Sequence, residues 1–188
     1  MSVFSQNRIT AITDSDGDDE TPAKTVTFLY NAGGQRVLKV SEDTTTVYVN
    51  TLLVLRETEN GDVATKHYFI GANRMSAKVN EDIYYYHPDH LGSTQLITDV
   101  EGDIYEHFEY TPYGEMWVDG TRTDHDTKDI TAIRHAGIEF DSETGLYYHS
   151  ARYREPRTGH FVSVEPLLDQ LLKPGVSQNA VSYTHLTL

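Results

Sequence analysis

Two histidines and an aspartate lie close together in YYYHPDHLGSTQLITDVEGDIYEHFEYTPYGE, residues 84–115. His87 and His90 flank Asp89, and imidazoles at this spacing can share one metal ion when they lie on a helix. Pro88 and the strand-like residues before His87 argue against a helix, and no third ligand follows at a convincing spacing. We therefore expect a turn stabilised by histidine and aspartate side-chain hydrogen bonds, and no metal site.

A second group of candidate ligands lies in DSDGDDE, where Asp14, Asp16 and Asp18 have the spacing of the first ligands of an EF-hand loop. The sixth position of that loop is Asp19 rather than glycine, and the twelfth is Thr25 rather than a bidentate glutamate. The segment is expected to be a solvated acidic loop rather than a calcium site.

Serine and histidine also occur near one another, as some nucleophilic enzymes require. Ser93 and Ser150 are close to histidines in sequence, but neither lies in the G-x-S-x-G turn that activates a serine. Asp124, His125 and Asp126 belong to a polar stretch that is typical of an exposed loop. Neither arrangement predicts a hydrolase.

Aromatic side chains offer one more kind of chemistry, because a platform of tyrosines can stack against sugar rings. In a sheet, a tyrosine more often packs against a cross-strand neighbour and points its hydroxyl toward water or a backbone group. Packing is the favoured interpretation, and sugar binding the alternative, for Tyr84, Tyr85, Tyr86, Tyr105, Tyr110, Tyr113, Tyr147, Tyr148 and Tyr153. The only tryptophan, Trp117, is interpreted as a core or edge anchor.

Composition narrows the class of protein further. The 188 residues are 38% hydrophobic, which allows one modest core. A net charge of −14 argues against nucleic acid and anionic membranes as partners, because phosphate groups require a basic face. The absence of cysteine excludes disulfides and thiol chemistry. No stretch reaches the roughly 20 apolar residues of a membrane span, and the N-terminus lacks a signal-peptide pattern.

The elements that position these residues are predicted to be strands joined by tight turns. From Thr25 onward, β-branched and aromatic runs alternate with glycine-containing turns. The turn signals fall at 31–34, 60–62, 101–103 and 142–145. A hairpin cannot bury its apolar face alone, so each must lean on the next. We therefore predict a mainly antiparallel β fold of stacked hairpins.

Several of these segments resemble the Rhs/YD-repeat family. FLYNAGGQRV looks like one YD repeat, with Tyr30, Gly34 and Arg36 in the family's order. HYFIGANRMSAKV and the segment at 84–115 look like repeats that lead into the family's core. RHAGIEFDSETGLYYHSARYREPRTGHFVSVEP, residues 134–166, is similar to the Rhs-associated core itself. The resemblance covers about Thr25 to Gln178.

The resemblance implies a β-ribbon wound into a hollow shell that the core closes at one end. The partner would be a C-terminal toxin or cargo domain of a longer parent chain, held inside the shell. A secretion-system component or surface carbohydrate is a further implied partner, and the protein would be secreted or on the cell surface. A cell-surface YD-repeat protein that binds carbohydrate or a neighbouring cell is the alternative function. No cofactor, nucleic acid or membrane span is expected.

The family's self-cleavage resembles aspartyl-protease chemistry, in which two carboxylates share a proton and an arginine tunes their charge. Arg152 matches the family's arginine, and Glu165 stands where the first aspartate belongs. A carboxylate displaced by one methylene can slow a reaction about 100-fold. The second aspartate, in a DPxGL motif, is missing from the sequence. We expect no enzyme activity from this chain, although a full-length parent could cleave itself.

The chain is accordingly divided into four segments. Residues 1–24 are expected to be a flexible acidic segment, 25–133 YD-repeat-like hairpins, and 134–180 the Rhs-associated core segment. Residues 181–188, VSYTHLTL, resemble translated sequencing-adapter sequence and are interpreted as a non-native tail. One short amphipathic helix is predicted at 166–174, where leucines lie three and four positions apart between two prolines.

Overall fold

The computed structural model of the protein describes residues 2–5, 8–14, 24–121 and 130–163. Twelve strands form one antiparallel sheet, which we call the wall. Its strands are β1 (Ser2–Ser5), β2 (Arg8–Asp14), β3 (Lys24–Tyr30), β4 (Arg36–Val40), β5 (Thr44–Asn50), β6 (Leu53–Thr58), β7 (Gly61–Ile70), β8 (Asn73–Val79), β9 (Asp82–Pro88), β10 (Thr94–Thr98), β11 (Ile104–Tyr110) and β12 (Met116–Thr121).

A second sheet of three antiparallel strands, which we call the inner sheet, follows a short 3-10 turn, η1 (His135–Gly137). Its strands are β13 (Glu139–Asp141), β14 (Leu146–His149) and β15 (Arg152–Arg154). The change from one sheet to the other falls between Thr121 and Glu139.

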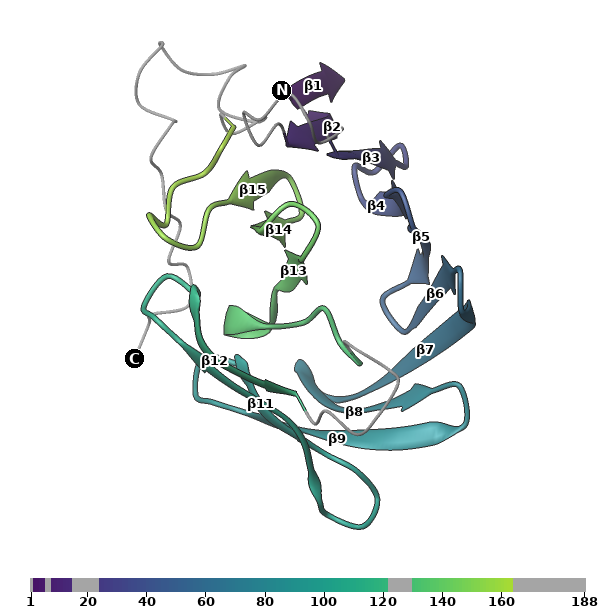
Figure 1. Cartoon of the computed structure of the whole chain (residues 1–188), viewed down its shortest axis with the longest axis vertical. Helices are drawn as coiled ribbons and strands as arrows, with labels where there is room; N and C mark the ends of the chain where they lie inside the picture. Colours follow the sequence, from purple (N-terminus) through teal and green to yellow (C-terminus); the bar gives the residue numbers. More distant parts are fainter. Residues whose placement is uncertain (1, 6–7, 15–23, 122–129, 164–188) are drawn as a thin grey trace.

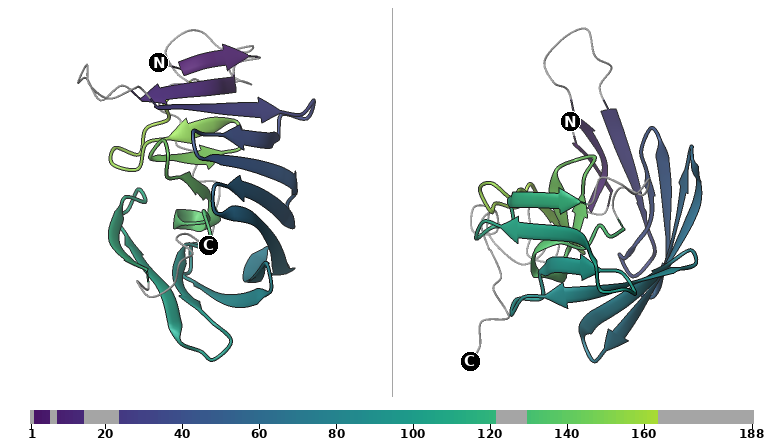
Figure 2. Two further views of the ribbon diagram at one scale, coloured as in Figure 1. Left: turned by 45° about the vertical axis from the view of Figure 1, so that its right-hand side comes forward. Right: turned by 60° about the horizontal axis from the view of Figure 1, so that its bottom comes forward.

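Strand order in the wall follows the chain from β1 to β12, so every strand pairs with its neighbours in sequence. This arrangement confirms the predicted mainly antiparallel fold of stacked hairpins. The wall curves, and the inner sheet lies on its concave side (Figure 1). Two further views show the same relation (Figure 2). Strand twist accumulates across a wide sheet, and register shifts in pairs such as β3–β4, β7–β8 and β10–β11 add local bends.

Four turns in the wall share one hydrogen-bond pattern, at Asn31–Gly34, Asp89–Gly92, Asp99–Gly102 and Thr111–Gly114. In each, the glycine N–H donates to the carbonyl of the first residue, whose own N–H donates to the carbonyl of the residue after the glycine. The four glycines have φ between +76° and +90°, a region that other residues rarely adopt. This recurring geometry explains why the turn signals contain glycine.

The core lies between the two sheets, because side chains of the wall alternate between its faces. On β3, Val26 and Phe28 are buried, whereas Leu29 is 52% exposed. Phe28 packs with Ile9 and with Tyr153 of the inner sheet. A larger apolar cluster lies at the other end of the wall and contains Ala77, Val79, Tyr84, Tyr86, Ile97, Tyr105, Phe108 and Ile130.

Three details differ from the sequence predictions or lie outside the description. Residues 2–5 and 8–14 form β1 and β2, so these parts of the expected flexible segment 1–24 are ordered. Ile9 is 2% exposed, and this burial explains the order, because an apolar residue anchors β2 in the core. The predicted helix at 166–174 and the tail at 181–188 lie outside the described residues.

Of the two predicted places for Trp117, in the core or at an edge, the core is wrong. Trp117 lies on β12, the last strand of the wall, and 77% of its surface is exposed.

In the part of the chain that the structure describes, no helix is long and apolar enough to cross a membrane.

Candidate functional site

A buried cluster of charges joins the inner sheet to the wall. We call Arg36, Lys39, Glu139, Asp141 and Glu143 the ion cluster. Arg36 Nη1 lies 2.6 Å from Asp141 Oδ2, and Arg36 Nη2 lies 2.8 Å from Glu139 Oε1. Lys39 Nζ lies 3.1 Å from Asp141 Oδ1 and 2.9 Å from Glu143 Oε2. The side chain of Asp141 is fully buried, so this carboxylate connects two wall cations to β13 inside the protein.

Aromatic rings surround the Arg36 guanidinium. Its Cζ lies 4.1 Å from the ring centroid of Tyr148 and 4.8 Å from that of Tyr48. Tyr48 donates a hydrogen bond of 2.5 Å to Glu139 Oε1, and Arg36 Nη1 donates to the Tyr153 hydroxyl at 3.2 Å. A cation held by carboxylates and ring faces at once is fixed in position.

The electrostatics of the ion cluster favour its charged state. Burial alone would lower the pKa of Arg36 and of Lys39, but the neighbouring carboxylates outweigh this effect and raise both. Burial raises the pKa of the phenols of Tyr48 and Tyr153 and outweighs the opposite effect of Arg36. Asp141 raises both pKa values further, and Glu139 raises that of Tyr48. Both cations therefore stay charged, and both phenols remain protonated donors.

Three further contacts hold the inner sheet in place. Tyr147 donates to the carbonyl of Gly114 at 2.8 Å, in the turn between β11 and β12, and Arg154 Nη1 donates to the carbonyl of Tyr113 in the same turn. At the opposite side, the Tyr30 hydroxyl lies 3.2 Å from that of Tyr153. The inner sheet is thus attached to early and late strands of the wall.

The connection into the inner sheet is also tied to the wall. The Ala136 N–H donates to Ser93 Oγ at 3.0 Å, and the Thr94 N–H donates to the carbonyl of Arg134 at 3.2 Å. Ser93 is fully buried, so its hydroxyl has a structural partner in η1. Ser150, the other serine considered for catalysis, lies in the turn between β14 and β15, and its carbonyl accepts a hydrogen bond from Arg8 at 2.9 Å.

The turn at His87 and Asp89 has the predicted structural role. Asp89 Oδ1 accepts hydrogen bonds from the backbone N–H groups of Leu91 and Ser93, both at 2.8 Å. His87 Nε2 lies 3.0 Å from Thr98 Oγ1, which links β9 to β10. The bonds of Asp89 confirm a turn stabilised by an aspartate side chain, whereas His87 lies on β9 and its bond joins two strands instead of closing the turn.

The other candidate sites are only partly covered by the structure. Within the described ranges, no group of three His, Cys, Asp or Glu residues is arranged to hold a metal ion. The acidic loop at 15–23 and the Asp-His-Asp stretch at 124–126 lie outside those ranges. Arg152 is on β15, 5% exposed, and its Cζ lies 3.6 Å from the ring centroid of Phe161. Glu165 lies outside the described residues, so the Arg152–Glu165 pair stays a prediction.

The tyrosines divide into two groups. Tyr84 and Tyr105 are buried, and their rings meet edge to face at 4.9 Å. Tyr147 and Tyr153 are buried in the inner sheet. These residues pack as sheet tyrosines are expected to. Tyr85 is 44% exposed and alternates with its buried neighbours on β9.

Sequence reasoning missed most of the ion cluster. The sequence interpretation includes Arg36 only as part of a repeat-like segment, and Asp141 only within the core-like segment 134–166. A usable signal was present, because RVLKV places two cations in an otherwise apolar strand, and buried cations need partners. The sequence offered no way to choose which carboxylates those partners are.

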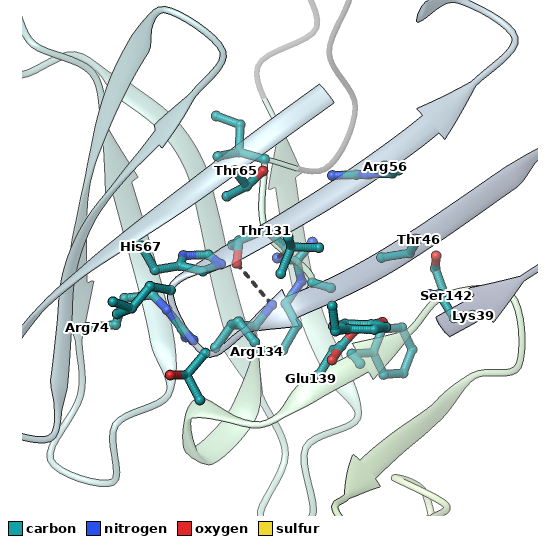
Figure 3. Close-up of a pocket in the computed structure, with 18 of the residues that line it drawn as sticks. Lys39, Thr46, Arg56, Thr65, His67, Arg74, Thr131, Arg134, Glu139 and Ser142 are labelled. Carbon is teal, nitrogen blue, oxygen red and sulfur yellow. Dashed lines mark hydrogen bonds between the residues drawn. The ribbon is translucent and has the colours of Figure 1, made fainter. Parts of the chain in front are cut away.

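A cavity of about 860 Å³ lies beside the ion cluster, between wall strands β4–β8 and residues 130–143 (Figure 3). Its lining includes Thr65, His67, Arg74, Thr131, Arg134 and Glu139. His67 is 7% exposed, and burial, together with the positive charge of Arg74, lowers its pKa to about 3. This histidine is therefore neutral at physiological pH.

No family model matches the chain. It is 34% identical over 168 residues to the tRNA3(Ser)-specific nuclease WapA of Bacillus spizizenii, a match that covers 86% of this chain and 7% of that protein. It is 33% identical over 118 residues to the toxin subunit YenC1 of Yersinia entomophaga, covering 62% of this chain and 12% of YenC1. The chain therefore spans only a small part of these relatives.

The fold is also found among solved structures. The crystal structure of TcdB2-TccC3 superposes with a TM-score of 0.72 at 24% identity, covering 87% of this chain and 9% of that chain. This likeness concerns the fold alone. In sequence, the similar proteins include WapA tRNA nucleases and the toxin subunits YenC1 and YenC2.

Proposed function

We propose that this chain is a wall segment and end plug of an Rhs-type toxin shell, which encloses a C-terminal cargo domain of a longer polypeptide. The observation that carries the proposal is the attachment of the inner sheet to the concave face of the wall through the buried Arg36–Asp141 pair. The strands of the inner sheet are only three and four residues long, so packing against the wall is expected to contribute to its stability. Its place inside the curve is that of a closing element.

Assignment to the Rhs/YD-repeat family rests on the repeating turns and on the relatives. Arg36, from the repeat-like segment, holds Asp141, from the core-like segment, so both parts of the resemblance meet in one contact. The relatives are called tRNA nucleases, toxin subunits and a double-stranded DNA deaminase toxin. By analogy, the cargo of this shell is a toxin domain, and the protein acts after secretion or at the cell surface.

The wall itself is proposed to be structural rather than catalytic. The buried cations of the wall form ion pairs with carboxylates of the inner sheet and of the turn after β13, as expected of a rigid support. In the longer polypeptide, Arg152 is proposed to assist self-cleavage, together with Glu165 in place of the family's aspartate. A product of cleavage that disappears in Arg152→Ala would support this role.

A cell-surface protein that binds carbohydrate is the second candidate function. It is favoured by Trp117, a large aromatic side chain that is 77% exposed on the last strand of the wall. Binding on a glycan array that is lost in Trp117→Ala would support this function. If the protein binds no glycan on the array, the carbohydrate-binding function is wrong.

Protease protection of the cargo tests the shell directly. In the longer natural polypeptide, the cargo domain should resist digestion, whereas Asp141→Asn should expose it because the inner sheet loses its main anchor. Glu81→Gln is the matched control, since Glu81 forms an ion pair with Lys78 but its side chain is 93% exposed. A cargo domain that is digested equally fast in all three proteins would overturn the proposal.

A further inference from the structure

The cavity beside the ion cluster contains an arginine that forms no ion pair among the described residues. Arg74 extends from β8 and lines the cavity. Its Nε is buried and makes no hydrogen bond, and among the described residues no carboxylate forms an ion pair with it. By contrast, Arg36 faces Asp141, and Arg134 Nη1 lies 3.9 Å from Glu106 Oε2. Burial lowers the pKa of Arg74, and the nearby Tyr86 and Glu139 offset this effect only in part.

The side chains near Arg74 carry polar groups that either make no hydrogen bond or can donate one to a ligand. His67 Nδ1 is buried and makes no hydrogen bond within the described part of the chain. Thr65 and His67 are two residues apart on β7, so both side chains point to the concave face. Figure 3 shows His67 and Arg74 together at one end of the cavity, near Thr131 and Arg134.

The lining also contains apolar and charged side chains. The Arg74 guanidinium lies 5.1 Å from the ring centroid of Phe69, and Ile130 and Phe140 also line the cavity. The charged residues of the lining are Lys39, Arg56, Arg74, Arg134, Asp43, Glu139 and Glu143. Lys39 pairs with Asp141 and Glu143, and Arg134 lies 3.9 Å from Glu106, so these two cations already face carboxylates, unlike Arg74. Glu139 and Glu143 would repel a dianion such as phosphate more strongly than a monoanion, whose single charge Arg74 can balance.

We propose that this cavity is a binding site for a carboxylate that carries an apolar group, with Arg74 as its charge partner. The planar guanidinium fork matches a carboxylate, and Phe69, Ile130 and Phe140 suit an apolar remainder. A volume of about 860 Å³ is within the range of ligand pockets. The ligand is either a small free acid or an acidic side chain of a polypeptide with apolar neighbours. The site does not depend on the shell proposal, because a free acid tests it without any cargo.

The test is an NMR titration of the purified chain with phenylacetate and, separately, with the capped peptide Phe-Glu-Leu. The expected result is movement of the backbone amide signals of β7 and β8 with a Kd of about 1 mM or tighter. Phenylacetamide and the peptide Phe-Gln-Leu, which lack the charge, should not bind. Binding of phenylacetate identifies a free-acid site, and binding of the peptide alone identifies a polypeptide ligand. If neither binds, the proposal is wrong.

Arg74→Gln provides the second measurement and should weaken binding by about tenfold or more. Arg157→Gln is the matched control, because the side chain of Arg157 is 77% exposed and does not line the cavity. Its affinity should equal that of the unchanged protein. If Arg74→Gln binds the acids as tightly as the unchanged protein does, the proposal is wrong. If this variant does not fold, the comparison of charged with uncharged probes on the unchanged protein tests the proposal instead.

Discussion

Asp141 Oδ2 lies 2.6 Å from Arg36 Nη1, although the two residues are 105 positions apart in the chain. This contact joins β4 of the wall to the last residue of β13 in the inner sheet. Both side chains are almost completely buried. Because a buried charge without its partner is costly, the pair holds the inner sheet in one position on the wall.

Removal of one partner should therefore destabilise the protein strongly. Asp141→Asn leaves Arg36 and Lys39 short of negative charge, and we expect a loss of about 3–5 kcal/mol in the free energy of unfolding. Chemical denaturation monitored by circular dichroism measures this loss. Glu81→Gln, in an exposed ion pair, should cost less than about 1 kcal/mol. Equal losses for the two variants would contradict the role of the buried pair.

The turn at Gly114 should tolerate a methyl group less well than a similar turn that faces no other element. A Cβ at Gly114 would lie 2.8 Å from Cγ of His135, whereas a Cβ at Gly102 would meet nothing within 4 Å. Their φ values, +90° and +88°, are nearly equal, so the backbone strain of an alanine is shared. We expect Gly114→Ala to lower stability by about 1–3 kcal/mol more than Gly102→Ala. Equal thermal unfolding midpoints would argue against close contact between this turn and η1.

The hydroxyl of Tyr153 should contribute measurably to the attachment of the inner sheet. It lies 3.2 Å from the hydroxyl of Tyr30 and 3.2 Å from Arg36 Nη1. Tyr153→Phe keeps the buried ring and removes these bonds, so we expect a loss of about 1–3 kcal/mol in urea unfolding. Tyr85→Phe, at a residue 44% exposed, should change stability by less than about 0.5 kcal/mol. No difference between the two variants would rule out this contribution.

Stability should fall as the pH falls below 6.5, in part because of His149. Burial, followed by the positive charges of Arg154 and Arg152, lowers the pKa of His149 to about 4. The unfolded chain takes up the proton near pH 6.5, whereas the folded protein takes it up only near pH 4, so protons favour unfolding between these values. The contribution of His149 is fully present above pH 6.5.

The pH prediction is checked by urea unfolding at a series of pH values between 4 and 7. His149→Gln should make the decline of stability with falling pH less steep, since one proton-linked group is gone. Each unit of lowered pKa corresponds to about 1.4 kcal/mol. An unchanged slope in His149→Gln would show that His149 is accessible to protons in the folded state.

The sequence was informative about local structure and much less so about the contacts between distant segments. Glycine-containing turns and alternating side chains predicted the hairpins, because both are set by neighbouring residues. The partner of Arg36 is 105 positions away, and its choice depends on how far the wall curves, which no local pattern encodes. For the same reason the cavity at Arg74 was not predicted. The sequence did not predict strand β2, because the acidic residues that follow it are typical of a flexible segment and the burial of one isoleucine, Ile9, has no local signal.

Native-state hydrogen exchange of the inner sheet tests the central claim most directly. If β13–β15 are fixed to the wall, their amides should open with the same free energy as those of β8–β11, which carry the larger apolar cluster. In Asp141→Asn, the inner-sheet amides should exchange far faster while those of β8–β11 stay protected. Inner-sheet amides that already exchange within seconds in the unchanged protein, beside a protected wall, would contradict the account.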